Sequence, residues 1–174
     1  MADTQRTLAA LLTLLADNST GAISAQDVRD MLVSVAGGYG GLGLTDGSAA
    51  QTLVATTAAK FTGFDATRPS SGVTPSTGND ELTIDDADAD YSISAALTFS
   101  IDTAADVEVS VVKNDSVTLF KSGAIAVASG EVARVELDDI AALAAGDTLQ
   151  VYVESDTAGD LTGQQASLKA KRLN

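Results

Sequence analysis

The sequence predicts a mainly β protein, a two-sheet sandwich or jelly roll, preceded by a short N-terminal helical hairpin. Three observations support this prediction. Apolar residues recur at helical spacing within residues 1–36, a glycine-rich stretch follows at 37–50, and apolar and polar residues alternate as in strands from residue 51 onward. We therefore expect a helical hairpin anchor (1–36), a glycine-rich linker (37–50) and a β jelly-roll domain (51–174).

Two apolar stripes define the expected hairpin. Each places four side chains at positions i, i+3, i+4 and i+7, which share one face of a helix. The stripes consist of Leu8, Leu11, Leu12 and Leu15, and of Val28, Met31, Leu32 and Val35. A hairpin of this size cannot bury its stripes alone. These eight residues are therefore the candidate interaction face, covered by the β domain, by sister copies or by a different protein.

The stretch from Gly37 to Ser48 is rich in glycine and serine, which gives the backbone great conformational freedom. This freedom argues for a linker and against a hairpin that folds back onto its own domain. Residues 38–43 also match Gly-x-Gly-x-x-Gly. A dinucleotide site needs a strand before that motif and a helix after it, whereas a helix is expected before it here, so a linker is favoured.

Strand signals recur at short intervals in the β domain. The longest covers Tyr91–Ile101, where apolar and small polar residues alternate over the whole length. Further strands are expected near 52–58, 82–84, 107–111, 117–120, 124–127, 133–137, 149–153 and 166–170. We expect residues 68–78, which are rich in turn formers, to be a long loop with a binding surface as one option. The strand spacing is typical of a sandwich or jelly roll.

Composition excludes several classes of chemistry. The sequence contains no histidine and no cysteine, so a Ser-His-Asp triad, a thiolate metal site and a disulfide are ruled out within one chain. The pair Asp138–Asp139 meets a requirement of glycoside hydrolysis, but an acidic chain always offers some such pair. We expect no enzyme activity, no catalytic or cofactor-binding residues and no cofactor.

The acidic charge bears on partners. Ten basic residues against 24 acidic ones give a net charge of −14. Phosphate backbones and anionic lipids would repel such a chain, so neither nucleic acid nor a membrane is expected as a partner. The apolar run Thr7–Ala16 is also far too short to span a bilayer.

A cluster of carboxylates lies between Asp85 and Asp90. Strand alternation predicts Asp86, Asp88 and Asp90 on one face, where their repulsion requires water or a cation. An EF-hand is excluded, because Tyr91 and Leu97 stand where that motif needs Gly and Glu. An irregular calcium site and a solvated strand entry both stay open, and no metal ligand is assigned.

Two segments resemble known families. Residues 143–153, Leu-Ala-Ala-Gly-Asp-Thr-Leu-Gln-Val-Tyr-Val, and a last strand ending at Leu173 resemble the closing strands of complement C1q and tumour-necrosis-factor-like (C1q/TNF-like) jelly rolls. That resemblance implies a homotrimer. Residues 6–35 are similar to the opening segment of tailed-bacteriophage structural proteins, in which a short helical head precedes a fibre or jelly-roll module. Together the two resemblances imply a virion protein.

The resulting expectation is a non-enzymatic phage virion structural protein on the outer surface of the particle. It would be a trimeric capsid decoration or head-fibre protein that docks through its N-terminal helices onto other virion proteins of the capsid or tail. The alternative is a short tail fibre that recognises a host surface receptor, either a glycan or a protein. Carbohydrate sites favour exposed aromatic residues, and Tyr152 is the one strand aromatic expected to face away from the core, which favours decoration.

Overall fold

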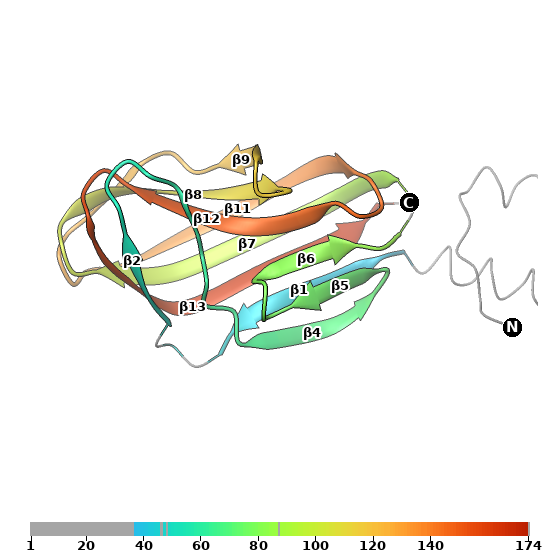
Figure 1. Ribbon diagram of the computed structural model, residues 1–174, viewed down its shortest axis with the longest axis horizontal. Coiled ribbons are helices and arrows are strands. Elements are labelled where there is room, and N and C mark those ends of the chain that lie inside the picture. The colour runs from blue at the N-terminus through green and yellow to red at the C-terminus, as the bar shows by residue number, and fades with distance from the viewer. Residues whose placement is uncertain (1–36, 46, 48, 87, 174) are drawn as a thin grey trace, which may run out of the picture.

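The computed structural model describes residues 37–45, 47, 49–86 and 88–173. These residues form two antiparallel β-sheets that face each other (Figure 1). The predicted β-sandwich is therefore confirmed. Within these ranges no helix is both long and apolar enough to cross a membrane. The predicted helical hairpin lies outside the described residues and stays a prediction.

The first sheet, called sheet A, has the strand order β11–β7–β13–β1–β4, and β2 pairs with the first part of β13. Its strands are β1 (Tyr39–Leu44), β2 (Ala49–Leu53), β4 (Ala66–Ser71), β7 (Ala89–Ile101), β11 (Val132–Leu143) and β13 (Gly159–Arg172). The two longest strands, β7 and β13, pair along most of their length at the centre of this sheet.

The second sheet, called sheet B, has the order β10–β8–β12–β6–β5, with β3 beside β12 and β9 beside β8. Its strands are β3 (Ala59–Lys60), β5 (Val73–Ser76), β6 (Glu81–Ile84), β8 (Ala105–Lys113), β9 (Val117–Lys121), β10 (Ile125–Val127) and β12 (Thr148–Ser155). The longest strand of sheet B, β8, has 9 residues, against 14 in β13 of sheet A. Turns of sheet B at Asn114 and Gly146 adopt left-handed conformations.

The core lies between the two sheets and follows the predicted alternation. Every second residue of β7 from Tyr91 to Ile101 is buried, and the residues between them face outward. Most of β8, β12 and β13 follows the same pattern, which is interrupted at Val112, at the buried Gln150 and at the bulge between Gly163 and Gln165. Phe61 and Phe64 add an edge-to-face pair with ring centroids 5.4 Å apart. Alternation therefore predicted both the strands and the side that each strand buries.

The glycine-rich stretch is not a linker where it is described. Tyr39–Leu44 forms β1, which pairs with β13 on one side and with β4 on the other. Here the glycines permit close approach, because a Cβ on Gly40 would lie 2.8 Å from Val73 Cγ1. The prediction of a flexible segment at 37–50 is therefore wrong for the residues of β1, and the β domain begins earlier than residue 51.

The prediction of a long loop at 68–78 is also wrong for most of this segment. It forms β4 and β5, joined at Gly72, which has a φ of 63°. The strand expected near 52–58 ends at Leu53, and the chain turns through Thr56, which has a φ of 56°. The turn-forming residues of this segment led to the prediction of a loop. The structure instead has an edge strand, β4, which can contain Pro69 because an edge strand has one side without a partner strand.

Candidate functional site

The outer face of sheet A, which points away from sheet B, is built from small side chains at its centre. β7 contributes a row of five such residues, namely Ser92, Ser94, Ala96, Thr98 and Ser100. In the neighbouring strands, Ser167 of β13 and Gly43 of β1 stand opposite each other in register. The β7 part of this face therefore has no bulky side chain, whereas the adjacent central strand β13 carries Lys169 and Lys171.

Arg68 of β4 lies across β1 on this face. A Cβ on Gly41 would lie 3.4 Å from Arg68 Cδ, and one on Gly43 would lie 3.1 Å from its Nη2 atom. The same Cβ on Gly41 would also lie 3.2 Å from Lys169 Cγ of β13. The two glycines thus leave room for the Arg68 side chain to lie close to the sheet.

Opposite charges occupy the two borders of the outer face of sheet A. The basic border consists of Arg68 on the edge strand β4 and extends inward to Lys169 and Lys171 on the central strand β13. Glu136 and Asp138 lie on the exposed edge strand β11 and form an acidic border, in which Glu136 is paired with Arg134 of the same strand. The small residues of β7 separate the two borders, so the face is polarised across its strands.

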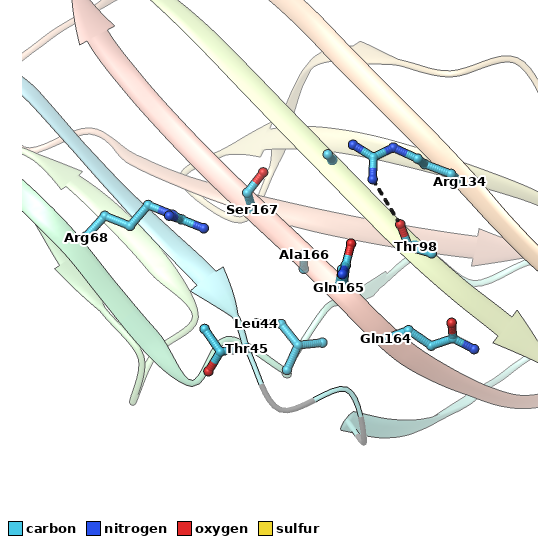
Figure 2. A pocket seen from close by; sticks show the side chains of 10 residues that line it. Leu44, Thr45, Arg68, Thr98, Arg134, Gln164, Gln165, Ala166 and Ser167 are labelled. Carbon is cyan, nitrogen blue, oxygen red and sulfur yellow. Dashed lines mark hydrogen bonds between the residues drawn. The ribbon is translucent and has the colours of Figure 1, made fainter.

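A hollow of about 430 Å³ lies on the same face between the borders. Figure 2 shows Arg68 and Arg134 reaching into it from opposite sides, with Ser167 between them. Arg134 donates to Thr98 Oγ1 at 3.5 Å and, through Nε, to Glu136 Oε1 at 2.8 Å. Arg68 forms no ion pair or hydrogen bond with a described residue, so its guanidinium is available to an anionic group.

A buried ion pair lies at the end of the sandwich where β1 begins and β13 ends. Asp86 Oδ2 lies 3.9 Å from Arg172 Nη1, and the two side chains are 2% and 10% exposed. The Asp86 carboxylate packs against Gly38 and Gly72, while its backbone N–H donates to Gly72 O at 3.1 Å. Arg172 N–H donates to Gly38 O at 2.6 Å. This cluster connects β1, the β4–β5 turn and β13.

Tyr91 is fully buried beside this pair. Burial, reinforced by the Asp86 charge, raises the pKa of Tyr91 to about 12. Within the described part of the chain, its hydroxyl and Arg172 Nη1 have no hydrogen-bond partner. Tyr91 is therefore protonated at neutral pH and does not provide a base for catalysis.

The carboxylates of the predicted cluster do not share a face. Asp86 is buried, whereas Asp88 and Asp90 are exposed and Asp88 accepts from Ala145 N at 3.3 Å. Among the described residues, no group of three or more potential ligands is arranged to hold a metal ion. The prediction of a common face is wrong, because β13 and the β4–β5 turn enclose Asp86.

On sheet B, Tyr152 faces outward as predicted, but it is already engaged. Its hydroxyl donates to Asp115 Oδ1 at 2.9 Å, and Lys60 lies 3.5 Å from Asp115 and 3.6 Å from Glu81. Tyr39 on β1 is a second outward-facing strand aromatic, with 43% of its surface exposed. Treating residues 37–50 as a linker concealed Tyr39. The exposed pair Asp138–Asp139 lies on the outer edge of sheet A and lines no described cavity.

Stability should depend on pH with opposite signs at Asp86 and Asp147. Burial raises the pKa of Asp86 above 3.8, so the folded state binds this proton more tightly and gains stability as pH falls through the raised value. The pKa of Asp147 is lowered because hydrogen bonds from Ala144 N, Asn114 and Lys113 outweigh desolvation. Its contribution is lost as pH falls below 3.8.

Urea unfolding of wild type, Asp86→Asn and Asp147→Asn across this pH range tests both signs. Relative to Asp86→Asn, wild type should gain stability on acidification. Relative to Asp147→Asn, it should lose stability. A difference that stays constant with pH for either variant would contradict the assignment for that residue.

The sequence-predicted interaction face, Leu8 to Leu15 and Val28 to Val35, lies outside the described residues. Conversely, sequence reasoning did not identify the polarised face. Its charges come from strands far apart in the sequence, and only register brings them together. The sequence did contain a signal. The outward positions of 91–101 carry small side chains, and those of 166–170 include a basic one.

Comparison of the sequence with known family profiles and with curated proteins finds no match. Among solved structures, Eiger TNF from S. frugiperda is similar with a TM-score of 0.58 at 13% identity, covering 79% of this chain and 94% of that one. Murine APRIL has a TM-score of 0.54 at 15% identity, covering 78% and 99%. PRD1 vertex protein P5 has a TM-score of 0.55 at 16% identity, covering 79% and 97%.

These likenesses agree with the two antiparallel sheets and with the resemblance of residues 143–153 to the closing strands of C1q/TNF-like jelly rolls. At such low identity they bear on the fold alone. The described part of this chain has a TNF-like jelly-roll fold.

Proposed function

We propose that this protein is a non-enzymatic structural protein on the outer surface of a phage particle. In this proposal it is a homotrimeric capsid decoration or head-fibre protein that attaches through residues 1–36 and displays the jelly roll. The observation that carries the proposal is the order of its parts. A sequence segment with two helical apolar stripes directly precedes a jelly roll that has its own core between two sheets.

The position of the chain ends supports attachment by one end. β1 begins beside the end of β13, as the Arg172 N–H to Gly38 O hydrogen bond shows (Figure 1). The turns after Ile101 and Ser155 lie at the opposite end of sheet A. Residues 1–36 therefore join one end of the domain, and the opposite end is free to point away from a particle.

One fold neighbour and the expected number of copies support a structural role. One neighbour is a vertex protein, PRD1 P5, which favours a place on the surface of a virion. The jelly-roll family resembled here implies three copies per assembly, and three linked anchors bind a symmetric lattice more firmly than one. Decoration also stabilises the assembled state to which it binds.

Substitutions in the apolar stripes test the docking role in the full-length protein. Leu11→Asp combined with Leu32→Asp should weaken binding to particles that lack this protein by more than about tenfold, because two buried leucines contribute roughly 1.5–3 kcal/mol each. The measurement is co-sedimentation of the protein with those particles. Thr13→Asp combined with Ser34→Asp is the matched control, because it adds the same charge outside the stripes.

Immunogold electron microscopy with an antibody against the β domain tests the location. Gold on heads supports decoration. Gold at tail tips would overturn it in favour of the short tail fibre that binds a host surface glycan or protein.

In the co-sedimentation experiment, an equal loss of binding for the stripe variant and the control variant would contradict docking through the stripes.

A further inference from the structure

The hollow on the outer face of sheet A has charged side chains of one sign only. Arg68 of β4 and Arg134 of β11 both line it, and none of the described residues in its lining carries a carboxylate. Figure 2 shows the two guanidinium groups entering from opposite sides, with Gln165 and Ser167 of β13 between them. In a chain with a net charge of −14, two cations that converge on one hollow are a local reversal of the overall charge.

Arg68 is held in position without using its hydrogen-bonding capacity. The three atoms nearest to a Cβ built on Gly43 all belong to the Arg68 guanidinium, with Nη2 at 3.1 Å. The guanidinium therefore lies directly against β1, and a side chain at position 43 would displace it. No described residue forms an ion pair or hydrogen bond with the Arg68 side chain, so its N–H donors are left for a ligand.

Arg134 is oriented by its neighbours and keeps one nitrogen available to the hollow. Its Nε atom donates to Glu136 Oε1 at 2.8 Å, which fixes the plane of the guanidinium. Its Nη1 atom lies 3.5 Å from Thr98 Oγ1, a long contact that uses one N–H group. Because Nη1 carries two N–H groups, it is the part of Arg134 that can donate to a ligand.

Neutral hydrogen-bonding groups complete the lining, and a β-bulge supplies two of them. The register of β13 against β7 shifts between Gly163 and Gln165, and Gln164 and Gln165 both line the hollow. In a regular strand, consecutive side chains would point to opposite faces. The hollow, of about 430 Å³, falls within the range of roughly 300–1,000 Å³ that is typical of small-molecule sites. It therefore has room for an organic anion as well as for an inorganic one.

We propose that this hollow binds an oxyanion, a phosphate or a carboxylate group, which bridges Arg68 and Arg134. The planar fork of Arg68 matches two acceptor sites of such a group, while Arg134 Nη1 and the Ser167 hydroxyl donate to the remaining ones. Inorganic phosphate and the carboxylate of an acidic sugar share this chemistry. The inference goes beyond the proposed function and does not depend on where the protein lies on a particle.

Binding of two probe anions to the full-length protein tests the site. Isothermal titration calorimetry at low ionic strength should give saturable binding of inorganic phosphate or of glucuronate, and the tighter of the two identifies the source of the group. Glucose, which lacks the charge, should bind at least about tenfold more weakly than the preferred anion. The NMR signals of the Gln165 side-chain amide should shift during the titration, because this amide lies between the two arginines.

Substitutions separate this site from a general attraction to basic side chains. Arg68→Gln and Arg134→Gln should each weaken anion binding by at least about tenfold. Gly43→Ala keeps both charges but should also weaken binding, because its Cβ meets the Arg68 guanidinium. Lys171→Gln is the matched control, since it removes a positive charge from the same face outside the hollow and should leave binding unchanged. Circular dichroism verifies that each variant is folded.

Two results would overturn the oxyanion site. One is wild type that binds neither anion saturably. The other is equal weakening by Arg68→Gln and Lys171→Gln, because binding would then follow the charge of the whole face and not the hollow. The Arg68 side chain is exposed, so Arg68→Gln should fold like wild type. Neither result bears on attachment through residues 1–36, which the co-sedimentation experiment tests separately.

Discussion

Gly72→Ala is expected to lower the free energy of unfolding by about 3 kcal/mol. Gly72 joins β4 to β5 with a φ of 63°, a region that costs a residue with a Cβ roughly 1–2 kcal/mol. The added Cβ would also overlap the Asp86 carboxylate, which is buried between Gly38, Gly72 and Arg172. Displacing a packed, buried group costs typically about 1–3 kcal/mol more. Urea unfolding at a fixed protein concentration measures the sum.

Gly130→Ala separates the two causes. Gly130 has a φ of 74°, close to that of Gly72, but nothing lies within 4 Å of the position that its Cβ would occupy. This variant should therefore show the backbone cost alone, roughly 1–2 kcal/mol. Equal losses for the two variants would mean that the Asp86 carboxylate moves aside without cost.

The alternating strands could be predicted because burial on one face leaves a direct trace in the sequence. In β7, the residues from Tyr91 to Ile101 that alternation assigned to the core are the ones that the structure buries. The same reasoning located β8, β12 and β13. No long-range information was needed, since each strand carries its own pattern of apolar and polar residues.

β1 could not be recognised in the same way, because its outward positions after Tyr39 are Gly41 and Gly43. Glycine signals both a flexible linker and a strand that is closely approached by its neighbours. The difference lies in Arg68, Lys169 and Val73, which are distant in sequence and occupy the space that the glycines leave. The polarised face was hidden for the same reason, since its charges meet only after β4, β11 and β13 have paired in register.

Asp86 shows how tertiary packing changes the role of a residue that sequence reasoning placed on one face with Asp88 and Asp90. Alternation within 85–90 gave no reason to separate it from Asp88 and Asp90. It is buried because the β4–β5 turn and the end of β13 close around it, with Gly38 and Gly72 providing the space. Its partner, Arg172, lies at the far end of the chain.

The pairing of Asp86 with Arg172 should produce strong coupling in a double-mutant cycle. Asp86→Ala leaves the nine-tenths buried guanidinium without its carboxylate and should cost about 3 kcal/mol or more of unfolding free energy. Arg172→Met leaves the carboxylate buried without this guanidinium. Its cost should be large at neutral pH and should shrink on acidification, because a proton can then neutralise Asp86.

The double variant Asp86→Ala/Arg172→Met replaces the pair with apolar groups and should recover most of the stability lost in either single variant. Coupling measured this way isolates the pair from each residue's other contacts. Glu108 and Lys121 provide the comparison. Their side chains are only 2.8 Å apart but are 25% and 58% exposed, so solvent screens them and their coupling should be weak. If Asp86 and Arg172 were no more strongly coupled than this exposed pair, burial would not determine the energy of the contact, and the end of the sandwich would be held by its backbone hydrogen bonds, such as that from Arg172 N–H to Gly38 O.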